Sequence, residues 1–164
     1  MSKIFGLNFE DKSEEATKIL EEKFINIDEV PSKEINSNSV LPYNYIIEGE
    51  NLYSLNLLKF THKQSFDLIY IDPPYNRPGQ KFKYDNDFID PEDPWLHSKW
   101  LSFMNHRLKI AKQLLKTDGV FICAIDEKEQ EPLGLLLRKI FSNYETEILV
   151  DQHNKRGKQC RGLS

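Results

Sequence analysis

The segment Asp72-Pro73-Pro74-Tyr75 stands directly after the apolar run 66–71 and combines residue types that can do chemistry. Each proline fixes its own backbone and keeps the residue before it extended, and neither has an N–H. The segment is therefore stiff and offers only hydrogen-bond acceptors, namely the Asp72 carboxylate and the neighbouring backbone carbonyls. With the flat ring of Tyr75 beside them, these acceptors predict a receptor for a planar group that carries an NH2, such as a nucleobase.

The nitrogen of such an amine is a poor nucleophile because its lone pair is delocalised into the ring. If the Asp72 carboxylate and the Pro73 carbonyl each accept one hydrogen, the nitrogen becomes more tetrahedral and its lone pair points out of the ring plane. Acceptors that are already in place need no reorganisation in the transition state. Asp72 can also take up the released proton, a role we rank second because a carboxylate is a weak base. An isolated Asp-Pro pair is usually only a turn, but the longer string favours the functional interpretation.

Several apolar segments predict the sheet and the helices that would position this turn. Apolar stripes at helical spacing predict helices over residues 51–60 and 95–116 and from Pro132 onward. Short apolar runs predict strands over residues 45–47, 67–71, 120–125 and 148–150. Strands that alternate with helices indicate an α/β domain with a mostly parallel sheet and helices on both faces. Asp72 then lies at the carboxyl end of a strand, where open parallel sheets bind ligands.

Composition limits the class of protein. The chain has 164 residues, of which 39% are apolar and 29% charged, as in one folded domain. A net charge of −4 argues against nucleic-acid binding over the whole surface, although residues 153–162 are basic and contain no acid, so that they either contact phosphates or form a solvated tail. There is no membrane-spanning run and no signal peptide, and two cysteines favour a reducing cytoplasm.

A wider pattern surrounds the Asp-Pro-Pro-Tyr segment. It is preceded by Gly49-Glu50-Asn51 and followed by Trp100, Phe103, Arg107, Leu108, Ala111, Leu114, Leu115, Asp118, Gly119 and the segment 125–129. From about Tyr45 onward, this pattern resembles the N6-adenine DNA methyltransferases that carry a D-P-P-Y signature, and above all the modification subunits of type III restriction–modification systems. The resemblance implies the Rossmann-like fold of S-adenosylmethionine-dependent methyltransferases. It also implies site-specific methylation of an adenine in DNA.

The resemblance implies roles for the residues of the turn. Asp72 and Pro73 hold the target amine, and Tyr75 stacks on the adenine. The adenine must be flipped out of the duplex, since the amine of a paired base is out of reach. Pro74, Tyr75 and Asn76 are expected to line the pocket for the base.

The resemblance also implies a cofactor and partners. Glu50 and Asp72 are expected to contact S-adenosylmethionine, the methyl donor, and no metal ion is expected. Lys155 and Arg156 are expected to contact the phosphates of double-stranded DNA. The other expected partner is a restriction subunit or a separate C-terminal half of the enzyme.

The chain departs from the family in one respect. The family also uses a glycine-rich loop of the F-x-G-x-G kind, whereas none of the seven glycines here is separated from another by a single residue. We therefore expect residues 41–164 to be the N-terminal, catalytic-motif part of a methyltransferase domain, without its target-recognition region and cofactor loop, and residues 1–40 to be a helical extension. Such a chain is expected to bind S-adenosylmethionine poorly and not to turn over alone.

Three alternatives remain open at this point. The chain can be a non-catalytic DNA-binding or subunit-docking relic of such an enzyme. It can also act on an RNA adenine or a protein amide, because the pocket alone does not decide between them. A metal-dependent hydrolase built on Asp72, Asp85, Asp87, Asp90 and Asp93 is less favoured, because clustered acids in a loop are usually solvated.

Overall fold

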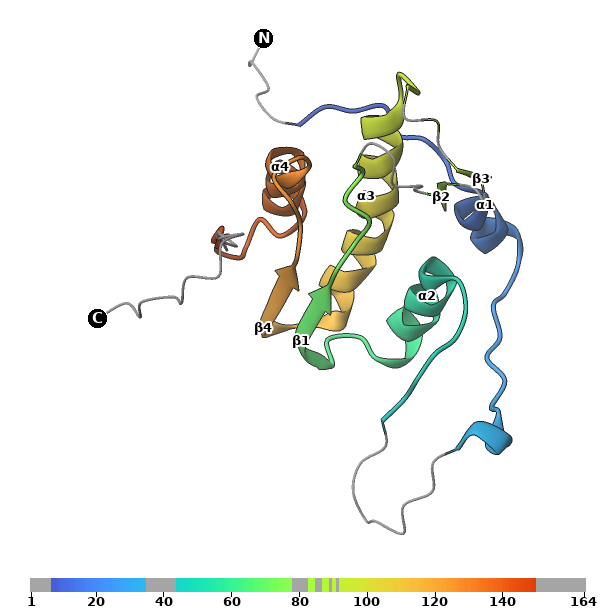
Figure 1. Ribbon diagram of the computed structural model, residues 1–164. Coiled ribbons are helices and arrows are strands. Elements are labelled where there is room, and N and C mark those ends of the chain that lie inside the picture. Colours follow the sequence, from blue (N-terminus) through green and yellow to red (C-terminus); the bar gives the residue numbers. More distant parts are fainter. Residues whose placement is uncertain are drawn as a thin grey trace, which may run out of the picture.

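The computed structural model describes residues 7–34, 44–77, 83–84, 87–88, 90 and 92–149. Lys155, Arg156 and Asp85 lie outside these residues. The elements, in chain order, are α1 (Glu15–Glu22), the short 3₁₀ helix η1 (Pro31–Lys33), α2 (Asn51–Thr61), β1 (Phe66–Ile71), β2 (Lys83–Tyr84), β3 (Asp87–Phe88), α3 (Leu96–Leu114), β4 (Leu115–Cys123) and α4 (Gln130–Ile140) (Figure 1).

The sheet that matters for the site consists of β1 and β4, which run parallel. Leu68 pairs with Val120 and Ile71 with Cys123, and the register shifts between Phe66 and Leu68. The chain crosses from β1 to β4 through a small antiparallel pair, β2 and β3, and through the long helix α3. The predicted α/β class with a parallel sheet is confirmed.

Helix α3 forms the centre of the core. Its apolar stripe recurs at Trp100, Met104 and Leu108, which are almost fully buried and pack against Leu133 and Leu136 of α4. One face of the sheet packs on the same cluster through Ile69, Ile71, Phe121 and Cys123. The four-residue spacing predicted from the sequence thus corresponds to the buried face of α3.

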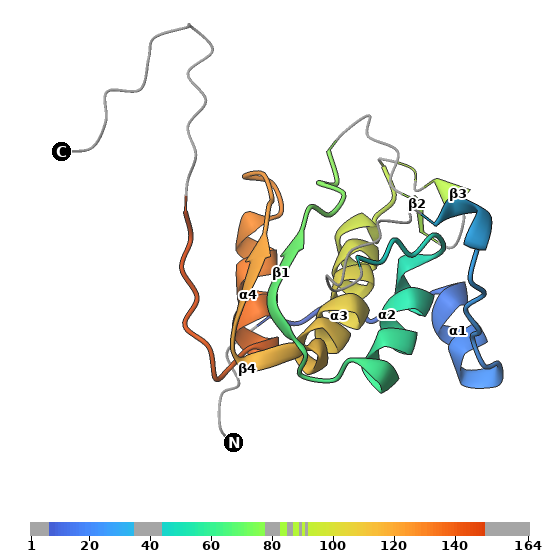
Figure 2. The same cartoon turned by 90° about the horizontal axis from the view of Figure 1, so that it is seen from below.

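The N-terminal helices form a smaller apolar cluster on the other side of α3. Leu52 of α2 packs with Ile110 and Leu114, and Ala16 and Leu20 of α1 pack against this group. Figure 2 shows α3, α2 and α1 following one another away from β1. Helix α1 therefore joins the domain through α2 and α3.

The second face of the two-stranded sheet is bare in the described part of the chain. Leu68 and Tyr70 of β1 are 55% and 62% exposed, and Val120 and Ile122 of β4 are 55% and 44% exposed. The sequence predicted helices on both faces, whereas the helices that the structure describes lie on the face of Ile69. The apolar character of both faces, which is typical of a parallel sheet covered on both sides, is nonetheless present.

Two predicted strands are wrong. Residues 45–47 have no regular structure, and Ile46 is 94% exposed. Ile148 and Leu149 are also irregular, and residue 150 lies outside the described residues. A strand exists only through hydrogen bonds to a neighbouring strand, and an apolar run carries no information on whether that neighbour is present. Among the described helices, none is long and apolar enough to cross a membrane.

Candidate functional site

The Asp-Pro-Pro-Tyr turn lies where the sequence predicted it, at the carboxyl end of β1. The backbone N–H of Ala124 donates to the carbonyl of Ile71 at 2.9 Å, so the last residue of β1 is bonded to the chain that leaves β4. Asp72 follows immediately and is exposed. Both strands point toward the end of the molecule at which α3 begins (Figure 1). The carboxylate therefore stands at the edge of the sheet where ligands bind in such folds.

The second proline of the turn is anchored to the core. The indole Nε1–H of Trp100, which is fully buried, donates to the Pro74 carbonyl at 2.7 Å. Among the described residues, no donor reaches the Pro73 carbonyl. The Pro74 carbonyl is thus used to fix the turn, and the Pro73 carbonyl is left as the backbone acceptor beside Asp72.

Tyr75 already uses the acceptor of the candidate site. Its hydroxyl donates to Asp72 Oδ1 at 2.6 Å. This hydrogen bond, together with smaller effects of burial and of the Asp72 charge, raises the pKa of the Tyr75 phenol above its usual value. The guanidinium of Arg77 lies 5.6 Å from the centre of the Tyr75 ring. A ligand amine that binds Asp72 must therefore compete with the Tyr75 hydroxyl.

Asn76 ends the turn and is buried rather than open to a ligand. Its backbone is left-handed, with a φ of 56°, a conformation that asparagine adopts more readily than most residues. Its side-chain N–H donates to Glu129 Oε1 at 2.6 Å, and its carbonyl accepts from Lys128 Nζ at 3.3 Å. The sequence predicted that Asn76 lines the pocket for the base, whereas its observed contacts hold the turn from behind.

Glu129 was not predicted as a site residue, although it ends the segment 125–129 that contributed to the resemblance. Its side chain is completely buried, and its Oε1 accepts from both Asn76 Nδ2 and His97 Nδ1, the latter at 2.7 Å. Its Oε2 has no hydrogen-bond partner within the described part of the chain. A buried carboxylate with a single used oxygen is uncommon and requires an explanation.

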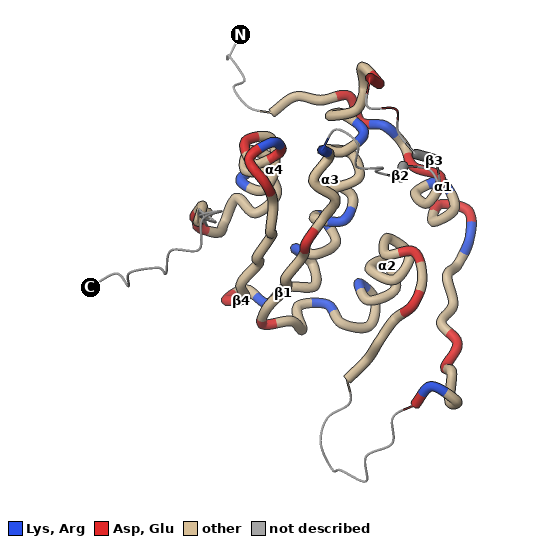
Figure 3. Tube along the Cα trace, in the orientation of Figure 1, with Lys and Arg blue, Asp and Glu red and all other residues tan. Residues whose placement is uncertain are grey.

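Other acids surround the same edge. Asp126 accepts from Arg77 Nε and, through Oδ1, from the backbone N–H of Lys128 at 3.0 Å. Burial raises the pKa of Asp126, but these hydrogen bonds outweigh it and the pKa lies below its usual value. Figure 3 shows acidic positions at the beginning of α4, close to the carboxyl end of β1. Arg77 and Lys128 bring positive charge to this edge, where they bind Asp126 and the Asn76 carbonyl respectively.

Glu50, the residue expected to contact the cofactor, lies in a different network. Its Oε2 accepts from the backbone N–H groups of Leu52 and Tyr53, at 2.6 and 3.1 Å, and so caps α2. Its Oε1 accepts from Arg107 Nη2 at 3.0 Å. Both oxygens of Glu50 are therefore used within the fold.

The acids of the loop after the turn make local contacts where they are described. Asp90 Oδ1 accepts from the backbone N–H of Glu92, and Asp93 binds Lys99 Nζ at 2.6 Å. The side chain of Asp87 and all of Asp85 are outside the described residues. Within the residues that the structure does describe, no group of three or more histidines, cysteines and acids is arranged for a metal ion.

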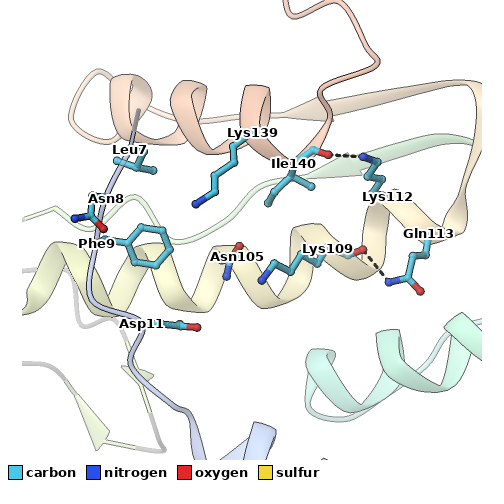
Figure 4. Close-up of a pocket in the computed structure, with 10 residues that line it drawn as sticks. All are labelled: Leu7, Asn8, Phe9, Asp11, Asn105, Lys109, Lys112, Gln113, Lys139 and Ile140. Carbon is cyan, nitrogen blue, oxygen red and sulfur yellow. Dashed lines mark hydrogen bonds between the residues drawn. The ribbon is translucent and has the colours of Figure 1, made fainter. Parts of the chain in front are cut away.

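A pocket of about 570 Å³ lies away from these residues, between residues 7–11, the second half of α3 and the end of α4 (Figure 4). Lys109, Lys112 and Lys139 line it, and Lys112 Nζ donates to the carbonyl of Ile140 at 2.5 Å. None of the predicted site residues lines this pocket. It therefore belongs to the packing of the N-terminal segment and not to the candidate site.

The chemistry available at the edge of the sheet is that of hydrogen-bond acceptors. Burial, with a smaller contribution from the Asp72 charge, raises the pKa of the Cys123 thiol to about 12. Cys123 therefore remains protonated near neutral pH and is not a nucleophile. The arrangement can bind and polarise a hydrogen-bond donor such as an amine. The nucleophile must then be an atom of the ligand itself.

Comparison with known proteins gives a family. Residues 66–160 match the family model described as DNA methylase. The probable type III restriction-modification enzyme HindVI Mod subunit of Haemophilus influenzae is 46% identical over 98 residues, which are 60% of this chain and 12% of that protein.

Two further relatives each cover about two thirds of the chain. The type III restriction-modification enzyme EcoPI Mod subunit of Escherichia phage P1 is 35% identical over 132 residues, which cover 66% of this chain and 20% of that protein. The type II methyltransferase M.KpnI of Klebsiella pneumoniae is 37% identical over 113 residues, which cover 67% of this chain and 27% of that protein. The chain thus spans between 12% and 27% of the length of these three relatives.

Proposed function

The chain belongs to the DNA methylase family, and on that premise we propose that residues 41–164 carry the amine-holding part of a DNA adenine-N6 methyltransferase of a restriction–modification system. The observation that carries the proposal is the acceptor-only turn at the carboxyl end of β1, with Asp72 exposed and the Pro73 carbonyl beside it. Residues 1–40 then form an extension that is joined to the domain through α1. The proposed partner is double-stranded DNA, with a restriction subunit or a separate C-terminal part of the enzyme as a second partner.

The proposed mechanism begins with the binding of a flipped-out adenine. Its N6 amine displaces the Tyr75 hydroxyl from Asp72 Oδ1 and donates its two hydrogens to the Asp72 carboxylate and the Pro73 carbonyl. The Tyr75 ring, released from this bond, stacks on the base. The two acceptors make the nitrogen more tetrahedral and direct its lone pair out of the ring plane. After methyl transfer the nitrogen carries an extra proton, which the adjacent Asp72 carboxylate accepts.

S-adenosylmethionine is the methyl donor in this proposal, and its sulfonium supplies an electrophilic methyl group. The described residues do not make a complete site for it, because both oxygens of Glu50 are used in the fold and the chain lacks a glycine-rich loop of the F-x-G-x-G kind. We therefore expect the isolated chain to bind the cofactor weakly. Isothermal titration that shows tight binding by the chain alone would contradict this expectation.

The amine site can be tested on the isolated chain with nucleosides. We expect adenosine to shift the NMR signals of the Trp100 indole and the Tyr75 ring at millimolar concentration. Purine riboside, which lacks the amine, and N6,N6-dimethyladenosine, which has no amine hydrogens, are expected to bind less well. Asp72→Asn keeps the shape of the side chain but loses its charge, so it should remove the preference for adenosine. Equal binding of the three nucleosides, or shifts confined to the lysine-lined pocket, would refute the proposal.

Methyl transfer is tested separately. The chain is incubated with duplex DNA and S-adenosylmethionine, with and without a separately made C-terminal part of the enzyme, and the digested nucleosides are analysed for N6-methyl-2′-deoxyadenosine. We expect product only in the complemented mixture and none with Asp72→Asn. If the complemented mixture also gives no methylated product, the non-catalytic relic is favoured. Product from RNA but not from DNA would change the substrate class.

A further inference from the structure

The buried carboxylate of Glu129 has no part in the proposed chemistry, yet it contacts the residue next to Tyr75. We propose that Glu129 is a positioning residue that fixes the shape of the turn 72–76 through Asn76, so that the Asp72 and Pro73 acceptors converge on one ligand. The geometric part of this inference stands on contacts within the chain. Its consequence for methyl transfer rests on the proposed function.

The turn is held from behind by three hydrogen bonds. Trp100 of α3 donates to the Pro74 carbonyl at 2.7 Å, Lys128 donates to the Asn76 carbonyl at 3.3 Å, and Asn76 donates to Glu129 at 2.6 Å. Trp100 and Glu129 come from different elements of the core, namely α3 and the beginning of α4. The side chains of Asp72 and Tyr75 take no part in these three bonds and are hydrogen-bonded to each other.

Asn76 is the residue at which the shape of the turn is decided. Its left-handed backbone, with a φ of 56°, costs free energy for a residue other than glycine unless the surroundings support it. The bond to Glu129 provides that support, because it holds the buried Asn76 side chain against the carboxylate in this backbone conformation. Loss of the bond would release the backbone immediately after Tyr75, and with it the direction of the Asp72 and Pro73 acceptors.

The charge of Glu129 strengthens this hold at the expense of folding stability. Its Oε1 accepts two hydrogen bonds, and its Oε2 has no partner among the described residues. A neutral glutamine can accept the same two bonds through its single oxygen, and burying a charge with an unmatched oxygen is unfavourable. Hydrogen bonds to a carboxylate are, however, stronger than those to a neutral amide. A carboxylate at position 129 is therefore expected to lower the folding stability but to hold Asn76 more firmly than a neutral amide would.

The test is Glu129→Gln in the full chain, with Glu127→Gln as the matched control. Glu127 is an exposed acid on the same segment, so its substitution removes the same charge without touching Asn76. The first measurement is the hydrogen-exchange rate of the Trp100 indole N–H, with the exposed indole of Trp95 as internal reference. We expect Glu129→Gln to raise the Trp100 rate at least about tenfold, as loss of a charge-assisted hydrogen bond does, without lowering the melting temperature.

The second measurement reports on the acceptor itself. The bond to Asp72 raises the pKa of Tyr75, so a loosened turn should bring the pKa of Tyr75 closer to its usual value of about 10. The titration is followed by NMR of the tyrosine rings and assigned with Tyr75→Phe. A structural role that merely supports α4 would leave this titration unchanged.

Exchanging the amide of residue 76 and the carboxylate of residue 129 should restore the bond between the two residues. Asn76→Asp alone places two carboxylates together and should disturb the turn. This disturbance would not come from the backbone, because Asp tolerates the left-handed conformation nearly as well as Asn. In the double variant Asn76→Asp/Glu129→Gln, the new amide donates to the new carboxylate, and both reporters should return toward the original values. This variant also decides the case if either single variant fails to fold, because only a direct bond between the two residues predicts recovery.

The inference and the proposed function fail in different ways. If the reporters are unchanged in Glu129→Gln, change equally in Glu127→Gln, or are not restored in the double variant, Glu129 is not a positioning residue. If the reporters change as expected but the original chain does not prefer adenosine over purine riboside, the positioning stands and the proposed function fails. If both hold, Glu129→Gln should also weaken the preference for adenosine.

Discussion

Two buried carboxylate networks in this molecule differ in how completely they are satisfied. In the first, all three nitrogens of Arg107 donate to acceptors: Nε to Asn51, Nη1 to both oxygens of Glu14 and to the Phe103 carbonyl, and Nη2 to Glu50. In the second, Glu129 accepts from Asn76 and His97 through one oxygen, and its other oxygen has no partner within the described structure. The first network joins three helices, and the second lies behind the candidate site.

The difference teaches which network serves stability. A buried charge stabilises a fold only when its hydrogen bonds are complete, and that condition holds at Arg107, where α1, α2 and α3 meet. At Glu129 the condition is not met, which agrees with the general rule that local conflicts concentrate at functional sites. Substitutions in the first network should therefore reduce stability, and those at the edge of the sheet should change ligand binding with little change in stability.

The largest effect is expected at Arg107. Arg107→Ala leaves the Glu14 and Glu50 carboxylates without their shared donor, and breaking a buried ion pair in this way costs about 3–5 kcal/mol. The free energy of unfolding, measured in urea, should fall by that amount. Arg138→Ala, which removes an exposed arginine of α4, is the control and should change it by less than about 0.5 kcal/mol. Similar effects of the two variants would remove the distinction between the networks.

An intermediate effect that depends on pH is expected at Glu14. Burial raises the pKa of Glu14, but hydrogen bonds from His106 and Arg107 outweigh it, and the pKa in the folded protein is lowered. A lowered pKa means that the stabilisation is complete above the unfolded value of about 4.3 and is lost as the pH falls through the folded value. Glu14→Gln should therefore cost about 1–3 kcal/mol at pH 7 and progressively less as the medium becomes acidic. Urea unfolding at several pH values measures this, and a difference that stays constant or widens on acidification would contradict the assignment.

The smallest effect on stability is expected at Tyr75. Tyr75→Phe removes the bond to Asp72 but keeps the ring, and it should change the free energy of unfolding by less than about 0.5 kcal/mol. Because the amine then no longer competes with the hydroxyl, adenosine should bind about threefold more tightly, as expected for one hydrogen bond near the surface. Tyr75→Ala, which also removes the stacking face, should bind adenosine more weakly than the original chain. Weaker binding by Tyr75→Phe would show that the hydroxyl assists the ligand instead of competing with it.

The turn and the main helices were predictable from the sequence because their signals are local. The two prolines define the shape of the chain after Ile71, and the four-residue spacing of Trp100, Met104 and Leu108 defines the buried face of α3. Glu129 carried no such signal, since it meets Asn76 across 53 positions in the sequence and neither residue is part of a periodic pattern. The apolar segment at residues 45–47, which is not a strand in the structure, shows the same limit, because pairing between strands is decided by distant residues.

Glu50 illustrates a second limit on prediction from sequence. A carboxylate placed just before a helix can bind a ligand or cap the helix, and its residue type is the same in both cases. The sequence favoured the cofactor through the resemblance, whereas the observed bonds to Leu52, Tyr53 and Arg107 are those of a cap that also binds a buried arginine. The cofactor role of Glu50 remains a prediction, and it requires that one of these bonds be exchanged for a bond to the ligand.

The open face of β1 and β4 has a practical consequence for anyone who purifies the chain. This face carries neighbouring exposed apolar side chains, namely those of Leu68, Tyr70, Val120 and Ile122. The outer backbone edges of a two-stranded sheet can also form hydrogen bonds with strands of other molecules. Mutual repulsion at a net charge of −4 is a modest counterweight. Concentrated samples should therefore cluster on standing, bind hydrophobic dyes while still folded, and disperse again when mild detergent coats this sheet.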